Sequence, residues 1–322
     1  MWRRTELKAA RRGKTRTVNR DVQGVLVVDK PVGLTSHDVV QKVRRLFKTR
    51  QVGHAGTLDP VASGVLVILV GSATRIAQYL QEDDKEYHLT LVLGRSTDTQ
   101  DVTGRTVSEC DPARIDREDL EREVSKYRGT FMQTPPVYSA IKLRGQPLYK
   151  LARKGIAVTP EPRKVTVYSI DIDRWEPPRV SLKVICSKGT YMRTLCHDIG
   201  EGLGVGGCME SLIRARSGAF SLDEAVDLDT LPSDAPPDDL LGEAARGLAF
   251  PMVEPDPDDM KQTLQGRTIA WGGDEAAGLV SVVFNRRLLA IGEIDKLNGE
   301  KVLIPRRILE PKGKELFISV DK

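Results

Sequence analysis

The sequence predicts an α+β protein with one large domain followed by a small β-rich domain. Stretches in which apolar residues alternate, as in strands, are interleaved with segments that carry apolar residues at helical spacing. An acidic, proline-rich segment at 223–259 then interrupts the chain, and after it the apolar runs become short and closely spaced. A chain of 322 residues is long enough for this division. We therefore expect a large domain at 21–222, a connecting segment at 223–259 and a small domain at 260–322.

The charge distribution favours a polyanionic partner. Residues 1–20 hold eight Lys or Arg side chains, one acid and few apolar residues, which predicts a flexible basic tail. Between Leu222 and Asp259 twelve acidic residues stand against one basic residue, Arg246, so the remainder of this +4 chain carries a net charge of +15. A basic body with one acidic segment is typical of proteins that bind nucleic acid.

Several classes of protein are disfavoured by the composition. The longest apolar run, Val65–Val70, has six residues, which is too short for a membrane-spanning helix. The basic N-terminus lacks the apolar core of a secretory signal. The four cysteines form no Cys-x-x-Cys pair, so neither a zinc knuckle nor a redox pair is indicated. We expect a cytoplasmic protein with reduced cysteines and no membrane contact.

The first elements have clear boundaries. Gly24–Lys30 is a mostly apolar run typical of a strand, and Lys30-Pro31-Val32-Gly33 is a turn. Thr35 suits a helix N-cap, with Asp38 three residues later as an Asp variant of the capping box. The apolar residues that follow share one helical face: Val39, Val40, Val43, Leu46 and Phe47.

The stretch Gln51–Gly64, QVGHAGTLDPVASG, is the most unusual in the chain. Its glycines indicate a backbone that turns sharply or lets another molecule approach. Pro60 restricts the backbone of Asp59, so this carboxylate should sit on a rigid, extended loop. A carboxylate held in place is useful for catalysis. The alternative is an ordinary Asp-Pro turn between two surface elements.

The next segment combines strands and a helix. We expect a buried strand at Val65–Val70, a helix at Ala73–Leu80 and a half-buried alternating strand from Lys85 to Gly94. The loop Asp98–Asp101 could suggest a cation site, but two carboxylates without further ligands favour a hairpin turn.

The later elements are predicted by similar patterns. An amphipathic helix is expected at 116–128, and consecutive prolines make Gln133–Ala140 non-helical. Alternating strands follow at Val165–Trp175 and Val180–Ser187, before a helix that begins near Tyr191.

The C-terminal third is expected to contain a short helix and four strands. These are a helix around Asp238–Gly247, then strands at Leu279–Phe284, Leu288–Ile294, Val302–Ile304 and Leu316–Val320.

Three segments resemble the TruB family of pseudouridine synthases. They are GHAGTLDPVASGVL, KPVGLTS and QTPPVYSAIK followed by GxxLYxxAR spacing, and shorter matches occur at KEY, TDTQD, GTYMRTL and SLIRARSGAF. The resemblance implies a mixed, mainly antiparallel central sheet flanked by helices, with a PUA-like RNA-binding domain at the C-terminus. The form GHAG is similar to bacterial members of the family.

The resemblance also implies catalytic residues. Asp59 matches the family's nucleophile, and Arg193 matches the arginine that pairs with it, which would favour the charged form of the carboxylate. Tyr87 matches the tyrosine that lies against the target base, and by position it is also the candidate for removing the C5 proton. Attack of Asp59 on C1′, attack on C6 and a glycal intermediate all stay open.

Further matches imply substrate contacts. His54 matches a histidine that takes part in base flipping, and Tyr191 and Leu212 match base-pocket positions. Lys30 could support the catalytic loop or contact a phosphate, and Arg214 could reach the Asp59 pair.

The implied function is isomerisation of uridine to pseudouridine at position 55, in the T loop of tRNA. The reaction needs neither metal nor cofactor, and the implied partner is the T arm of tRNA, acted on by a monomer without an obligatory protein partner. One alternative is a guide-RNA-dependent synthase, and another is a non-catalytic RNA-binding or RNA-folding protein. A third is a metal-dependent hydrolase that uses Asp98 and Asp101.

Overall fold

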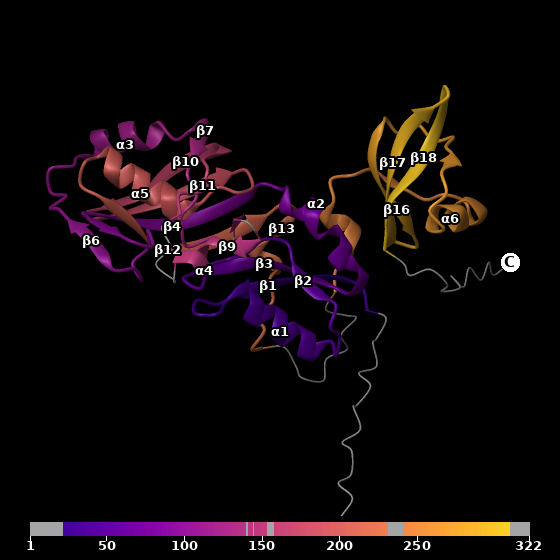
Figure 1. Cartoon of the computed structure of the whole chain (residues 1–322), viewed down its shortest axis with the longest axis horizontal. Coiled ribbons are helices and arrows are strands. Elements are labelled where there is room, and N and C mark those ends of the chain that lie inside the picture. Colours follow the sequence, from indigo (N-terminus) through magenta and orange to yellow (C-terminus); the bar gives the residue numbers. More distant parts are fainter. Residues whose placement is uncertain (1–21, 140, 144, 153–157, 231–240, 310–322) are drawn as a thin grey trace, which may run out of the picture.

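A nine-stranded mixed sheet forms the larger part of the computed structural model (Figure 1). The structure describes residues 22–139, 141–143, 145–152, 158–230 and 241–309. The strands of this sheet are β1 (Gly24–Lys30), β2 (Val52–His54), β3 (Ala62–Val70), β4 (Lys85–Leu93), β7 (Gly129–Gln133), β10 (Arg163–Glu176), β11 (Arg179–Cys186), β12 (Gly207–Ser217) and β13 (Phe220–Ser221). Their order is β1-β3-β12-β4-β11-β10-β7, with β2 beside β3 and β13 beside β12. Only β3 and β12 pair in parallel among these strands, which confirms a mainly antiparallel sheet.

The helices lie on both sides of this sheet. They are α1 (Ser36–Leu46), α2 (Ala77–Gln81), α3 (Arg117–Ser125), α4 (Leu148–Ala152) and α5 (Met192–Gly202). The predicted capping box of α1 is confirmed, because Asp38 N donates to Thr35 Oγ1 at 3.1 Å and Thr35 N donates to Asp38 Oδ2 at 2.9 Å. No helix in the described ranges is long and apolar enough to cross a membrane.

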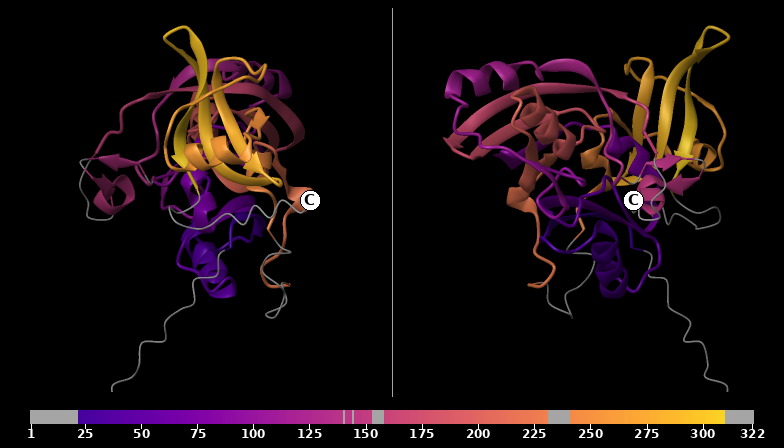
Figure 2. Two further views of the ribbon diagram at one scale, coloured as in Figure 1. Left: turned by 90° about the vertical axis from the view of Figure 1, so that its right-hand side faces the viewer. Right: turned by 60° about the vertical axis from the view of Figure 1, so that its left-hand side comes forward.

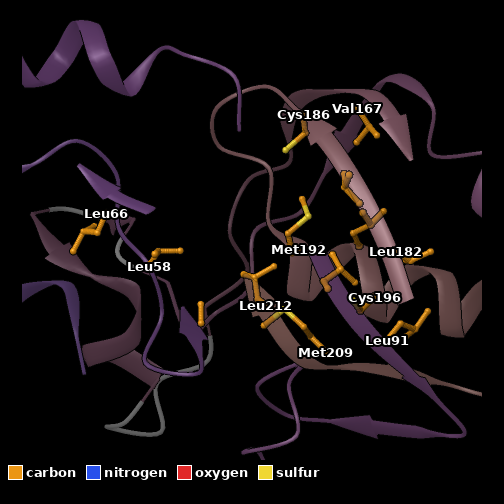
Figure 3. Packing of buried hydrophobic residues seen from close by; sticks show 14 of the residues in the cluster. Leu58, Leu66, Leu91, Val167, Leu182, Cys186, Met192, Cys196, Met209 and Leu212 are labelled. Carbon is orange, nitrogen blue, oxygen red and sulfur yellow. The ribbon is translucent and has the colours of Figure 1, made fainter. Parts of the chain in front are cut away.

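The main core lies between the sheet and the helices α1, α3 and α5. Alternate residues of the strands supply it, and Leu195, Cys196 and Ile199 of α5 close it from one side. Figure 3 shows Met192, Cys196 and Met209 of this core beside the strands that carry Leu91 and Leu182, with Leu58 and Leu66 farther away. This packing fixes the N-terminal turn of α5 against the middle of the sheet.

A second, five-stranded sheet forms the C-terminal body (Figure 2). Its strands, in spatial order, are β14 (Met252–Val253), β16 (Gly278–Phe284), β17 (Arg287–Leu297), β18 (Glu300–Ile308) and β15 (Ile269–Ala270). Helix α6 (Pro257–Leu264) packs with this sheet and begins at Asp256, whose carboxylate accepts from two backbone N–H groups of its first turn.

The two bodies share an apolar cluster. Val25 of β1 and Ile76 pack in one cluster with Leu288 and Ile291 of β17. Arg75 Nη1 adds hydrogen bonds to the carbonyl groups of Ile308 and Leu309, at 2.6 and 3.0 Å. The C-terminal sheet is therefore fixed to the back of β1 and β3 by burial of apolar surface.

Part of the acidic connecting segment also packs against the large sheet. Val226 N donates to Val27 O, and Gly242 N donates to Val25 O. Ala244 and Leu248 belong to the apolar cluster that the two bodies share. This segment therefore covers one edge of the sheet next to β1.

Several predicted elements differ from the structure. The helix expected at Ala73–Leu80 is a 3₁₀ turn at Gly71–Ile76 that continues into α2. The helix expected around Asp238–Gly247 is, in its described part, a 3₁₀ turn at Ala244–Gly247. The basic tail at 1–20 and the strand expected at Leu316–Val320 lie outside the described residues.

Two small hairpins complete the described structure. Strands β5 (Arg95–Thr97) and β6 (Thr106–Glu109) form one, which confirms the hairpin turn predicted around Asp98–Asp101. Strands β8 (Lys142–Leu143) and β9 (Gln146–Pro147) form the other.

Candidate active site

The loop between β2 and β3 carries Asp59 and is fixed by the start of α1. Ser36 Oγ accepts from Leu58 N at 2.8 Å and donates to Leu58 O at 3.0 Å. Gly33 N donates to Pro60 O at 2.7 Å. The residues on both sides of Asp59 are therefore hydrogen-bonded to the KPVGLTS segment, so the carboxylate has a defined position.

Lys30 stabilises the turn that meets this loop. Its side chain is fully buried, and Nζ donates to Pro31 O at 2.9 Å and to Leu34 O at 2.8 Å. An ammonium group in this position is directed at the backbone of its own turn. Of the two roles considered for Lys30, the geometry favours support of the loop over contact with a phosphate.

Arg214 braces the same loop from β12. Its guanidinium donates to Val65 O at 2.7 Å, to Gly56 O at 3.2 Å and to Thr57 O at 3.3 Å, and the residue is only 1% exposed. These donors are directed at the loop backbone rather than at the carboxylate of Asp59. The parallel pairing of β3 with β12 brings Arg214 to this place.

Gly64 is required where the loop enters β3. Its φ is +97°, and a Cβ at this position would lie 2.4 Å from Arg214 O. We expect Gly64→Ala to lower the free energy of unfolding by about 2 kcal/mol or more, because backbone strain adds to the clash. Activity should fall as well, since relief of the clash displaces Arg214.

Gly129→Ala is the matched control for this substitution. Gly129 has φ +96°, but nothing lies within 4 Å of an added Cβ. Thermal unfolding should show a loss of about 1 kcal/mol for this backbone strain alone. Equal losses for Gly129→Ala and Gly64→Ala would contradict the close contact with Arg214.

Asp59 and Arg193 form an ion pair at the mouth of a cavity. Arg193 Nε lies 2.9 Å from Asp59 Oδ2, and the side chains are 5% and 38% exposed respectively. Arg193 Nη1 donates to Thr99 O at 3.0 Å, and Nη2 donates to Tyr138 O at 2.8 Å. The guanidinium is thus held by two backbone carbonyl groups while it faces the carboxylate.

The Asp98–Asp101 loop supports the same arginine. Asp101 accepts hydrogen bonds from Thr99 Oγ1 and from Thr103 N, and its other oxygen lies 3.9 Å from Arg193 Nη1. Among the described residues, no group of three or more His, Cys, Asp or Glu side chains is arranged to hold a metal ion. The loop therefore supports Arg193 with the carbonyl group of Thr99 and with the nearby negative charge of Asp101.

The cavity has a volume of about 580 Å³, which is in the range of small-molecule and nucleotide sites. Predicted site residues that line it are His54, Asp59, Tyr87, Tyr191, Arg193, Leu212 and Arg214. Lining residues that the sequence analysis does not single out include Lys85, Ser139, Arg163, Lys164 and Lys188. The lining thus combines aromatic and apolar side chains with three exposed basic residues, Arg163, Lys164 and Lys188, which we call the basic rim.

Burial sets the protonation of the ring side chains. It raises the pKa of Tyr87 and that of Tyr191, so both phenols are neutral near pH 7. Burial, together with the charge of Arg214, lowers the pKa of His54, which favours a neutral imidazole. Neutral rings in this cavity suit stacking against a base.

Lys85 is a cavity residue that strand periodicity could have found. It lies two residues before Tyr87 on β4, so both side chains point to the same face of the sheet. Its Nζ donates to Gln81 O at 2.8 Å and to the carbonyl of Asp83. Burial lowers the pKa of Lys85 to about 8, and burial also lowers that of Lys30 to about 8.

RNA affinity should therefore weaken as the pH rises through about 8. Lys85, which lines the cavity, loses its charge in this range, so at low salt the dissociation constant for RNA should increase several-fold between about pH 7 and pH 9. Lys30 should contribute little, because its ammonium group is directed at its own turn. Filter binding across this range measures the effect, and Lys85→Met should flatten it. A pH-independent affinity would contradict this prediction.

Loss of charge on Lys30 and Lys85 does not destabilise the folded chain, so unfolding would not explain a weaker RNA affinity at high pH. Because both pKa values are lower in the folded chain, the unfolded chain binds more protons between about pH 8 and pH 10.5. The contribution of these groups to the free energy of unfolding therefore rises with pH in that window. Denaturant unfolding at each pH separates the two effects.

Comparison with known proteins identifies similar sequences across nearly the whole chain. The family model described as "TruB family pseudouridylate synthase (N terminal domain)" matches residues 44–192, and "tRNA pseudouridylate synthase B C-terminal domain" matches residues 193–236. A protein of Syntrophotalea carbinolica named tRNA pseudouridine synthase B is 43% identical over 91% of this chain and 95% of its own length. A protein of the same name from Sodalis glossinidius is 39% identical over 94% of this chain and all of its own length.

Solved structures include a similar fold. The chain matched in the crystal structure of a Cbf5-Nop10-Gar1 complex is 25% identical, with a TM-score of 0.66. The match covers 89% of this chain and 85% of that chain. The likeness extends over both sheets of the structure.

Proposed function

The chain belongs to the TruB family of pseudouridine synthases, and on this premise we propose that it modifies position 55 in the T loop of tRNA, with Asp59 as the nucleophile. It is an isomerase that converts uridine in tRNA to pseudouridine, the activity for which its curated relatives are named. The bacterial type is favoured over the guide-dependent type, because relatives named tRNA pseudouridine synthase B are 39–43% identical, against 25% for the chain in the Cbf5-Nop10-Gar1 complex.

The observation that carries the site assignment is the position of Asp59. Its carboxylate is partly exposed at the cavity, while Arg193 behind it is buried. A nucleophile needs one accessible oxygen and a fixed orientation, and this geometry supplies both. The exposed carboxylate can reach a nucleotide that enters the cavity.

The reaction breaks the bond between C1′ and N1 and forms a bond between C1′ and C5. Asp59 acts as the nucleophile on the nucleotide, the uracil turns within the cavity, and C5 loses its proton at the end while N1 gains one, so that the product is an isomer of uridine. A base in a folded loop must first leave its stack, at a cost of a few kcal/mol. Stacking on Tyr87 offsets part of this cost, at about 1–3 kcal/mol for each base.

Aromatic and apolar side chains of the cavity contact the base in this proposal. Tyr87, Tyr191 and Leu212 all line the cavity. The raised pKa of Tyr87 means that its phenol is protonated near pH 7, which supports a stacking and hydrogen-bonding role more strongly than removal of the C5 proton. His54, a neutral ring at the entrance loop, is placed to help displace the base.

Basic residues at the rim bind the RNA backbone in this proposal. Arg163 and Lys164 are exposed at the start of β10, and Lys188 is exposed on the loop before α5. These side chains suit phosphates on both sides of the extruded nucleotide. The C-terminal sheet acts as a PUA-like RNA-binding domain, and the T arm of tRNA spans both bodies. The protein acts in the cytoplasm as a monomer, with no guide RNA or protein partner.

Incubation of unmodified tRNA with the purified chain alone tests this function. Chemical mapping should find one pseudouridine for each tRNA, in the T loop at position 55. Modification elsewhere would contradict the proposed site in the RNA. A requirement for an added guide RNA or protein would contradict the stand-alone mode.

A further inference from the structure

The backbone of Tyr191 is held by a side chain from another element. Gln133, the last residue of β7, is only 2% exposed. Its Nε2 donates to Tyr191 O at 3.0 Å, and its Oε1 accepts from Tyr191 N at 2.8 Å. The amide therefore exchanges two hydrogen bonds with one residue, as a neighbouring strand does in an antiparallel sheet.

This amide holds the N-cap residue of α5 but does not cap the helix, because it accepts from Tyr191 N rather than from the N–H groups of the first turn. Tyr191 is the N-cap residue of α5, with extended backbone angles of φ −99° and ψ 111°, and no side chain caps the helix there. A tyrosine cannot accept the N–H groups of the first turn as Ser, Thr, Asp or Asn would. The direction in which α5 starts is consequently set from outside the helix, by Gln133.

A second glutamine holds the same turn from its other side. Thr194 Oγ1 donates to Gln100 Oε1 at 2.9 Å. Gln100 is itself fixed, because its carbonyl accepts from Met209 N at 3.0 Å. The two amides contact residues 191 and 194, so they bracket Arg193 in the sequence.

The bracketed turn carries three residues of the cavity wall. Tyr191, Met192 and Arg193 all line the cavity, whereas Gln133 lies behind them. Arg193 Nε is 2.9 Å from Asp59 Oδ2, so a shift of about 1 Å in this turn would change both the base pocket and the ion pair. Arg163 of the basic rim is the cross-strand partner of Gln133, and Lys164 is that of Met132, so backbone pairing of β7 with β10 positions the rim and the side-chain amide of Gln133 does not.

We propose that Gln133 is a positioning residue for the isomerisation, which sets Tyr191 and Arg193 against the nucleotide without touching it. Gln100 supports the same turn through Thr194. This role rests on the proposed function. Loss of the Gln133 amide should slow the chemical step and leave RNA affinity unchanged, because the side chains that contact phosphates are not hydrogen-bonded to this amide.

Gln133→Met tests the role, because it keeps the length of the side chain and removes both hydrogen bonds. Under single-turnover conditions with saturating tRNA, the rate of pseudouridine formation should fall about 10- to 100-fold. The dissociation constant for tRNA should stay within about twofold of the unsubstituted value. The matched control is Gln41→Met on the surface of α1, which removes a side-chain hydrogen bond to His37 and should leave both quantities unchanged.

Gln133→Glu provides a second test, which remains available if Gln133→Met does not fold. Its readout is the pH dependence of the rate. An ionised carboxylate can accept from Tyr191 N but cannot donate to Tyr191 O. A protonated carboxyl restores the donor, and burial raises its pKa, so the rate relative to the unsubstituted chain should recover between about pH 8 and pH 6. A purely structural contribution would change the folded fraction over the same pH range, so circular dichroism at each pH must show a constant folded fraction while the rate recovers.

The outcomes separate this role from the proposed function. A normal rate for Gln133→Met, or a loss that appears only in tRNA affinity, would overturn the positioning role. A pH-independent rate ratio for Gln133→Glu would overturn it as well. No product with the unsubstituted chain on any tRNA would instead overturn the proposed function.

Discussion

Asp59→Asn should reduce pseudouridine formation by at least about 10⁴-fold while tRNA still binds. The substitution keeps the shape of the side chain and removes the charge that makes the carboxylate a nucleophile. The partly exposed carboxylate is not needed to hold the loop, because Leu58 and Pro60 make the hydrogen bonds to the start of α1. The folded structure and the basic rim of the cavity should therefore persist.

Single-turnover assays and filter binding on the same preparation measure the two effects. Asp171→Asn is the matched control, since it removes an exposed carboxylate on β10 that pairs with Arg128. That control should keep full activity. Turnover by Asp59→Asn near that of the control would refute Asp59 as the nucleophile.

Arg193→Met should lose activity to a similar degree and also lower the free energy of unfolding by about 3 kcal/mol. Arg193 is buried, and its removal leaves the buried carboxylate of Asp101 without the nearby charge. It also leaves Thr99 O and Tyr138 O without their donor. The estimate is at the lower end of the range for buried pairs because Asp59 is partly exposed.

A surface pair gives the contrast for this prediction. Arg179 and Glu210 form a bidentate ion pair at the surface. Arg179→Met should therefore lower the free energy of unfolding by about 1 kcal/mol or less. Arg193→Lys should recover part of the stability but not the rate, since one ammonium cannot satisfy two carbonyl groups and a carboxylate in the same geometry.

A double-mutant cycle then tests whether Asp59 and Arg193 act as one unit. Combining Asp59→Asn with Arg193→Met should reduce the rate little further than either change alone. Multiplicative losses in rate would contradict a shared catalytic role.

Local patterns predicted the elements whose signals are contained within a few residues. The strand Gly24–Lys30 has the predicted bounds, and the Thr35 capping box begins α1 as expected. The alternation from Lys85 matches β4 to within one residue. In each case the residue pattern directly reflects which side chains are buried.

Strand β12 was missed because its pattern depends on distant partners. It lies between β3 and β4 in the middle of the sheet, yet it includes the buried Arg214 and an exposed Ile213. A charged residue at a buried position looks like a surface residue until the carbonyl groups of Gly56, Thr57 and Val65 are placed around it. Those carbonyl groups come from β3 and the loop before it, 149 to 158 positions earlier, which no local pattern reports.

The candidate catalytic residues were predicted from the family motifs, and the structure adds the contacts that hold them. Seven of the eight site residues named from the motifs line one cavity, and Lys30 stabilises the turn behind it. Gln133 is the first residue of the QTPPVYSAIK segment, but the sequence analysis assigned it no role, since the pattern does not report which backbone groups its amide contacts. The shared apolar cluster of the two bodies was likewise not predicted, and it means that deleting 260–322 would expose Val25 and its neighbours.

A crystal structure of Asp59→Asn bound to an unmodified T-arm hairpin tests the central claim most directly. The account predicts that the target uridine is extruded into the cavity, with its base against Tyr87 and its reacting atoms about 3–3.5 Å from the side chain at position 59. A uridine that stays stacked in the loop, or that lies in the cavity turned away from position 59 and Arg193, would contradict it.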